Sequence, residues 1–146
     1  MYASVDELKS RLLGRFDGIY TAVKGEGDDA AETWPEAEKD LADASSEIDG
    51  MLANRYGTPV TAEKALPILN DWTLTLAVEK AYMRSAGDEL PKKVIYASTE
   101  VRNKLKLAAS GDFRLMDVPE ISSGAGGISI VSGSDPVFPR EKMTGF

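Results

Sequence analysis

The sequence contains no cysteine and no histidine among its 146 residues. The absence of cysteine excludes disulfides, thiolate nucleophiles and thiolate metal ligands together. The absence of histidine removes the side chain that most often shuttles protons near neutral pH and most often binds metals. Catalysis by Ser-His or Cys-His pairs and most kinds of zinc site are therefore excluded.

Long apolar runs are also missing. No stretch approaches the ~20 consecutive apolar residues that a helix needs to cross a bilayer. The first residues, Met1-Tyr-Ala-Ser-Val-Asp-Glu7, lack the basic and then apolar order of a secretory signal. We therefore expect a protein that is made in a cytosol and has no membrane partner.

Acidic residues outnumber basic ones, with 24 Asp and Glu against 17 Lys and Arg, and the net charge is −7. Binding to nucleic acid draws its affinity from neutralised phosphates, so this balance argues against a general nucleic-acid binder.

The length suits one domain, which would bury about 68% of the surface that the unfolded chain exposes.

Periodic apolar residues predict a mainly α protein, a small bundle of about four helices. These helices are expected at residues 5–16, 36–56, 66–85 and 89–110. The first begins with a capping box, in which the Ser4 hydroxyl caps the helix and Glu7 reaches back to the cap. The second is expected to run to Tyr56 and to stop at Gly57, because glycine adopts the left-handed conformation easily and Pro59 cannot continue a helix.

Gly50 lies inside the second predicted helix, where an exposed glycine costs about 1 kcal/mol relative to alanine. Two interpretations stay open. The helix crosses another helix or contacts another subunit closely at this point, or the glycine is merely tolerated.

The third predicted helix carries no ionic residue from Trp72 to Val78, so we expect it in the middle of the bundle with Trp72 in the core. The fourth is followed by Gly111 and is the most basic of the four. Its basic residues either meet an acidic partner or phosphate, or balance acidic neighbouring helices. The second interpretation is favoured because they fall on more than one face: Lys92, Lys93, Arg102, Lys104 and Lys106.

Glycines and acidic residues between 17 and 33 predict a loop. The cluster Gly25-Glu-Gly-Asp-Asp29 lacks the alternating ligand order of a calcium loop, so no metal ion is expected there. Neighbouring carboxylates, such as Asp28 with Asp29 or Glu47 with Asp49, do not converge on a substrate. We expect no enzyme activity and no cofactor.

The composition changes after residue 118, so residues 1–118 are predicted to form the bundle and residues 119–146 a flexible linker with a docking arm. Ile128 to Val131 are rich in β-branched residues and are expected to form a short strand when the arm docks on a partner edge. Apolar anchors and basic residues complete the predicted docking set: Ile128, Ile130, Val131, Val137, Phe138, Arg140, Lys142 and Phe146.

Two stretches carry a family resemblance, namely Asp43-Ala-Ser-Ser-Glu-Ile-Asp-Gly-Met-Leu-Ala-Asn-Arg-Tyr56 and Phe138-Pro-Arg-Glu-Lys-Met-Thr-Gly-Phe146. On these residues, and in order over nearly its whole length, the chain resembles the small head-tail connector (adaptor) proteins of Mu-like bacteriophages and prophages. The resemblance implies a helical domain that assembles as a ring, expected to be a dodecamer, beneath the portal of the packaged head.

The same resemblance implies several partners. Genomic DNA passes through the ring without sequence-specific binding, and the arm docks on the portal protein or on a neighbouring subunit. A head-stopper or tail-completion protein is expected on the other side. The implied location is the neck of the virion, after assembly in the host cytoplasm.

Two alternatives stay open. The first is a tail-terminator or head-stopper protein, although such proteins tend to be rich in β-strands. The second is a small helical regulatory module that contacts nucleic acid through the lysines of the fourth helix, whose affinity for DNA would fall steeply with salt.

Overall fold

The computed structural model describes residues 1–85 and 89–121 of the chain. Its helices are α1 (Val5–Leu12), the 3-10 helix η1 (Leu13–Arg15), α2 (Phe16–Ile19), α3 (Pro35–Leu52), α4 (Leu66–Arg84) and α5 (Lys92–Ser110). Two short strands, β1 (Val23–Lys24) and β2 (Glu32–Thr33), form an antiparallel pair. The fold is mainly α, as the sequence predicts, and none of the described helices is long and apolar enough to cross a bilayer.

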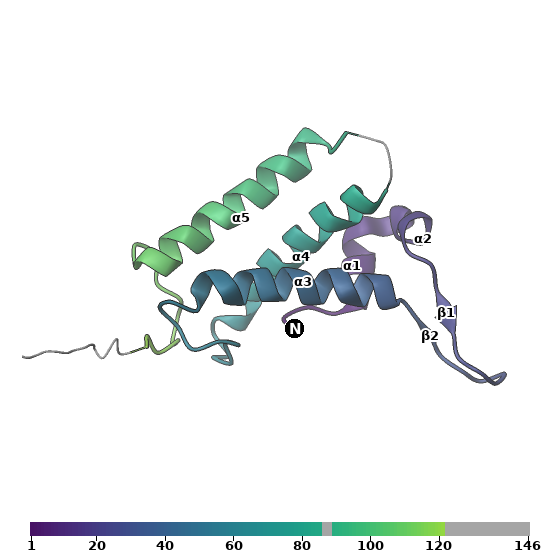
Figure 1. Ribbon diagram of the computed structural model, residues 1–146, viewed down its shortest axis with the longest axis horizontal. Helices are drawn as coiled ribbons and strands as arrows, with labels where there is room; N and C mark the ends of the chain where they lie inside the picture. The colour runs from purple at the N-terminus through teal and green to yellow at the C-terminus, as the bar shows by residue number, and fades with distance from the viewer. Residues whose placement is uncertain (86–88, 122–146) are drawn as a thin grey trace, which may run out of the picture.

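Helix α4 is the centre of the bundle, and it contacts α1, α2, α3 and α5. Figure 1 shows it between α3 and α5. Trp72 is only 2% exposed, and its ring lies 6.0 Å from that of Phe113. The expectation of a central third helix with Trp72 in the core is confirmed, because a helix that is apolar on all sides is stable only when other helices cover it.

The first helix begins as predicted and ends earlier. The Ser4 hydroxyl accepts a hydrogen bond from the Glu7 backbone N–H at 3.3 Å, and the Glu7 carboxylate accepts one from the Ser4 N–H at 2.8 Å. Leu13 then has φ 53°, which ends α1 after Leu12 instead of at Phe16. Phe16 starts the short helix α2 and is fully buried.

Helix α3 ends at Leu52, four residues before the predicted end at Tyr56. The stop at Gly57 is wrong, because the Arg55 N–H bonds to the Leu52 carbonyl only three residues back, at 2.9 Å, so the regular α-helical bonding ends before it. The Arg55 carbonyl accepts a hydrogen bond from the Ile121 N–H at 2.7 Å, and Tyr56 forms an isolated bridge with Glu120. These tertiary bonds attach residues 120 and 121 to the connector that follows α3.

Gly50 is exposed in α3, and a Cβ placed on it would meet no atom within 4 Å. Within the described part of this chain, no helix therefore crosses α3 closely at Gly50. This favours a tolerated glycine over an intramolecular crossing. The alternative subunit contact at Gly50 stays a prediction.

Helix α5 starts at Lys92, after Pro91, three residues later than predicted. It ends at Gly111, whose φ of 94° lies in the left-handed region, as the sequence predicts. One stripe of the helix is buried against α3 and α4, and it consists of Ser98, Val101, Leu105 and Ala108.

The segment predicted as a loop contains a hairpin. Val23 pairs with Thr33 and Lys24 pairs with Glu32, and the hairpin projects away from the helices beside the start of α3 (Figure 1). Two paired residues in each strand are too few to produce an alternating sequence pattern, so the loop prediction missed them.

The residues after α5 fold back onto the bundle. Glu120 forms an ion pair with Arg55 at 2.9 Å, and Leu115 is buried next to the Tyr56 hydroxyl. Glu120 and Ile121 thus contact the α3–α4 connector, and the predicted boundary after residue 118 stays a prediction. The predicted docking residues from Ile128 to Phe146 lie outside the described residues.

Candidate functional site

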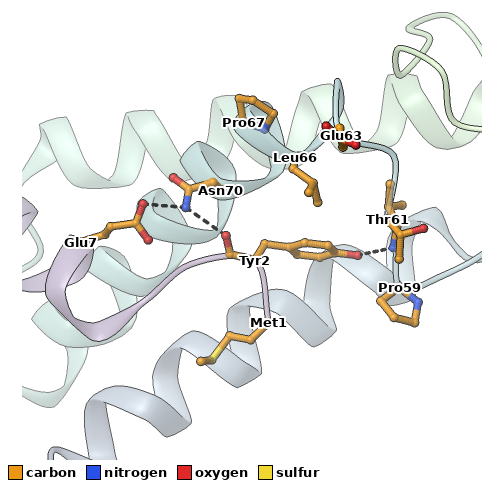
Figure 2. Close-up of a pocket in the computed structure, with 10 residues that line it drawn as sticks. Met1, Tyr2, Glu7, Pro59, Thr61, Glu63, Leu66, Pro67 and Asn70 are labelled. Carbon is orange, nitrogen blue, oxygen red and sulfur yellow. Dashed lines mark hydrogen bonds between the residues drawn. The ribbon is translucent and has the colours of Figure 1, made fainter.

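The N-terminal segment, the connector between α3 and α4 and the first turn of α4 surround an open groove of about 830 Å³ (Figure 2). The groove is lined by Met1, Tyr2, Glu7, Pro59, Val60, Thr61, Glu63, Leu66, Pro67 and Asn70. None of these residues belonged to the predicted docking set, because they come from separate parts of the sequence and share no motif.

Tyr2 fixes the shape of the groove. Its hydroxyl donates a hydrogen bond to Asp49 of α3 and accepts one from the Val60 N–H at 2.7 Å. Asn70 donates to the Tyr2 carbonyl at 3.0 Å and to the Glu7 carboxylate at 2.9 Å (Figure 2). The N-terminal segment is thereby attached to α3, to the connector and to α4.

The ionisation of these groups supports a structural role. Burial, and then the hydrogen bond to Asp49, raise the pKa of the Tyr2 phenol above its ordinary value, so it stays protonated. The hydrogen bonds from Ser4 and then Asn70 hold the pKa of Glu7 below its ordinary value. Tyr2 is consequently a hydrogen-bonding anchor, and Glu7 stays a charged carboxylate.

The groove has apolar walls and an acidic rim. Pro59, Leu66 and Pro67 supply apolar surface, and the Glu7 and Glu63 side chains carry negative charge at the edge. Such a surface suits an extended peptide that carries apolar and basic side chains, and it disfavours an anionic ligand.

The described residues bring together no group of three or more side chains of the kind that hold a metal ion. The acidic residues Asp28 and Asp29 lie exposed in the hairpin.

A second cluster of charged groups joins α3, α4 and α5. Arg102 of α5 donates from Nε to Glu47 of α3 at 2.7 Å and from Nη2 to Glu79 of α4 at 2.7 Å. Lys80 lies 3.3 Å from Glu47, and the Ser98 hydroxyl donates to Glu79. We call these five residues the Arg102 network.

The charges within the Arg102 network compensate one another. Burial alone would raise the pKa of Glu47 and of Glu79, but the hydrogen bonds and charge of Arg102 outweigh it and hold both pKa values below their ordinary value. The two carboxylates raise the pKa of Arg102 in turn. The interpretation that the basic residues of the fourth helix balance acidic neighbouring helices is therefore confirmed for Arg102.

A third cluster attaches α4 to α3 and to Tyr20, which directly follows α2. The Arg84 guanidinium donates to both oxygens of the buried Asp40 carboxylate, at 2.7 and 2.9 Å, and the Tyr20 hydroxyl donates to Asp40 at 2.7 Å. Burial, and then this hydrogen bond, raise the pKa of Tyr20. Both oxygens of the Asp40 carboxylate thus accept hydrogen bonds within the bundle.

The comparisons with known proteins extend these observations. Residues 2–123 match the protein family described as Bacteriophage Mu, Gp36. The match spans the helical bundle and stops before the predicted docking residues that begin at Ile128. A comparison with curated proteins found no match.

Proposed function

The chain belongs to the Bacteriophage Mu, Gp36 family, and from this premise we propose that it is a head-tail connector (adaptor) subunit of a Mu-like phage. In this proposal it forms a ring, expected to be a dodecamer, beneath the portal in the neck of the virion. Its partners are the portal protein and a head-stopper or tail-completion protein.

The observation that carries this proposal is the family match over the helical bundle. A mainly helical fold also favours an adaptor over the β-rich tail-terminator or head-stopper. The buried and half-buried charges agree with a structural role, because the carboxylates of Glu47, Glu79 and Asp40 are all paired with arginine. We propose that the protein has no catalytic activity and needs no cofactor.

The acidic balance of the chain suits a passage for DNA. A net charge of −7 gives the subunit a surface that repels phosphate on average, so DNA moves through the ring without being held. This repulsion is the proposed mechanism by which genomic DNA passes the joint between head and tail.

The C-terminal arm is the proposed docking element. Phe138 and Phe146 supply apolar anchors, and Arg140 and Lys142 supply positive charge, for the portal or a neighbouring subunit. The groove at Tyr2 has the complementary character, with apolar walls and an acidic rim. On a neighbouring subunit it is a suitable receptor for the arm.

Truncation after Ile121 tests the role of the arm, because it keeps the contacts of Glu120 and Ile121 with Arg55. We expect the truncated chain to unfold at the same temperature as the full chain and to lose binding to the portal in co-sedimentation. The matched control is the full chain with Ser132→Ala, which should bind as the original does. Undiminished portal binding by a folded, truncated chain would contradict the docking role.

The second candidate, contact with nucleic acid, rests on four exposed lysines of α5: Lys92, Lys93, Lys104 and Lys106. Affinity for duplex DNA that falls steeply with salt would support it. For a connector we expect no measurable duplex binding even at low salt.

A further inference from the structure

The hairpin formed by β1 and β2 is almost entirely exposed, with Ala30 alone partly buried between residues 21 and 33. Its acidic tip, which we define as Glu26, Asp28 and Asp29, lies beyond the paired residues. The described part of the chain places no ion pair on any of these three carboxylates. A two-stranded ribbon of this size is marginally stable on its own, so a partner would stabilise it.

The base of the hairpin is held firmly. Tyr20 precedes β1 and donates its hydroxyl to Asp40, and Trp34 follows β2 with its ring 5.8 Å from that of Phe16. The Lys9 ammonium lies 4.8 Å from the centre of the Trp34 ring. The two ends of the hairpin are therefore fixed to the bundle, which lowers the entropy cost of docking the tip on another surface.

Helix α5 carries a surface of the opposite character. Tyr96 is 70% exposed and Leu107 is 46% exposed, and they lie on the side of the helix that faces away from its buried stripe. Lysines flank them, and none of these lysines forms an ion pair with any residue in 1–85 or 89–121. This set covers the whole side of the helix that is turned away from the buried stripe, with Lys104 and Lys106 on its two flanks. We call it the outer face of α5: Lys92, Lys93, Tyr96, Lys104, Lys106 and Leu107.

The two surfaces are opposite in charge. The tip carries three carboxylates and the outer face of α5 carries four ammonium groups. The chain from Tyr20 to Gly27 reaches at most about 23 Å when extended, and the helix from Lys92 to Lys106 is about 21 Å long. The hairpin is thus long enough to place its tip against the outer face of a neighbouring copy.

We propose that the acidic tip of one copy docks on the outer face of α5 of the next copy. The hairpin projects from one side of the molecule and α5 forms the other edge (Figure 1), so each copy presents both surfaces to different neighbours. Such a head-to-tail contact closes into a ring when its rotation allows. This inference rests on the proposed ring and names the contact that builds it.

Cysteine crosslinking tests the contact directly, because the chain has no cysteine of its own. The double variant Asp28→Cys/Asn103→Cys places one thiol in the tip and one on the exposed side of α5. Under mild oxidation we expect a ladder of crosslinked oligomers on a non-reducing gel. Each single variant should stop at dimers.

The matched control is Asp28→Cys/Glu38→Cys, because Glu38 is exposed on α3 and outside the proposed contact. We expect at least about tenfold more higher oligomer from the Asn103 pair, since docking raises the local concentration of its thiols. Equal ladders from both pairs, or a double variant that stops at dimers, would overturn the head-to-tail contact.

Charge reversal supplies a second test in the same crosslinking assay. The variant Glu26→Lys/Asp29→Lys should abolish the ladder, and adding Lys92→Glu/Lys104→Glu should restore it. Reversal of two exposed carboxylates elsewhere, Asp17→Lys/Glu38→Lys, should leave the ladder intact. If both charge reversals abolish the ladder equally, or if adding Lys92→Glu/Lys104→Glu does not restore it, the attraction between the tip and the outer face of α5 is contradicted.

These results separate this inference from the proposed function. If the protein binds the portal but gives no ladder of crosslinked oligomers, the connector proposal stands and the hairpin contact is rejected. If the ladder forms but the protein does not bind the portal, the hairpin contact stands and the connector proposal is rejected.

Discussion

Replacement of Arg102 by Met removes the central cation of the Arg102 network and keeps an unbranched, apolar side chain. Loss of one partner from a fully buried ion pair costs about 3–5 kcal/mol, whereas exposed pairs contribute ~0–1 kcal/mol. The side chains here are intermediate, with exposures of 33% for Arg102, 26% for Glu47 and 12% for Glu79.

Two contacts survive the substitution and reduce its cost. Lys80 remains 3.3 Å from Glu47, and the Ser98 hydroxyl remains bonded to Glu79. We therefore expect Arg102→Met to lower the free energy of unfolding by about 2 kcal/mol, measured by urea denaturation at pH 7. Lys106→Met, on the exposed side of the same helix, is the control and should change it by less than about 0.5 kcal/mol.

The effect of Arg102→Met should depend on pH. The folded-state pKa values of Glu47 and Glu79 lie below their ordinary value of 4.5. Their contribution to stability is therefore complete above pH 4.5 and is lost as the pH falls through the folded-state pKa values. The difference between the original chain and Arg102→Met should shrink over that acid range.

A loss no larger than that of Lys106→Met would refute the reasoning, and so would a loss that stays constant from neutral to acid pH. Glu79→Gln supplies a further check. In the Arg102→Met background it removes an uncompensated charge and should recover part of the lost stability.

Three further substitutions are predicted, each measured by thermal unfolding against the original chain. Ser4→Ala removes the hydroxyl of the capping box and should cost about 1 kcal/mol, whereas Ser10→Ala on the exposed side of α1 should not. Gly111→Ala should cost at least about 1 kcal/mol, because φ is +94° and the new Cβ would lie 2.6 Å from the Arg55 guanidinium. Thr73→Val should raise the melting temperature by roughly 2–4 °C, because the buried Thr73 hydroxyl has no hydrogen-bond partner among the described residues.

Features encoded by neighbouring residues were predicted from the sequence. The capping box needs only Ser4 and Glu7, and the left-handed end of α5 needs only Gly111, so both are read correctly without knowledge of the fold. Burial of Trp72 follows from the apolar character of the whole helical segment around it.

Features that depend on distant residues were not predicted. Arg55 and Tyr56, just after α3, bond to residues 120 and 121, about 65 positions further along the chain. The groove exists because Tyr2 meets Asp49 and Val60, which lie 47 and 58 positions away. No local pattern marks such pairs of distant residues, so the sequence predicts the docking arm but does not predict the groove.

The most direct test of the connector proposal is electron microscopy of the full chain mixed with the portal protein of the same phage. The proposal predicts a closed ring of this protein stacked coaxially on the portal, with the central channel open through both. A portal that stays bare, or that binds isolated copies away from its axis at saturating protein, would contradict the proposal.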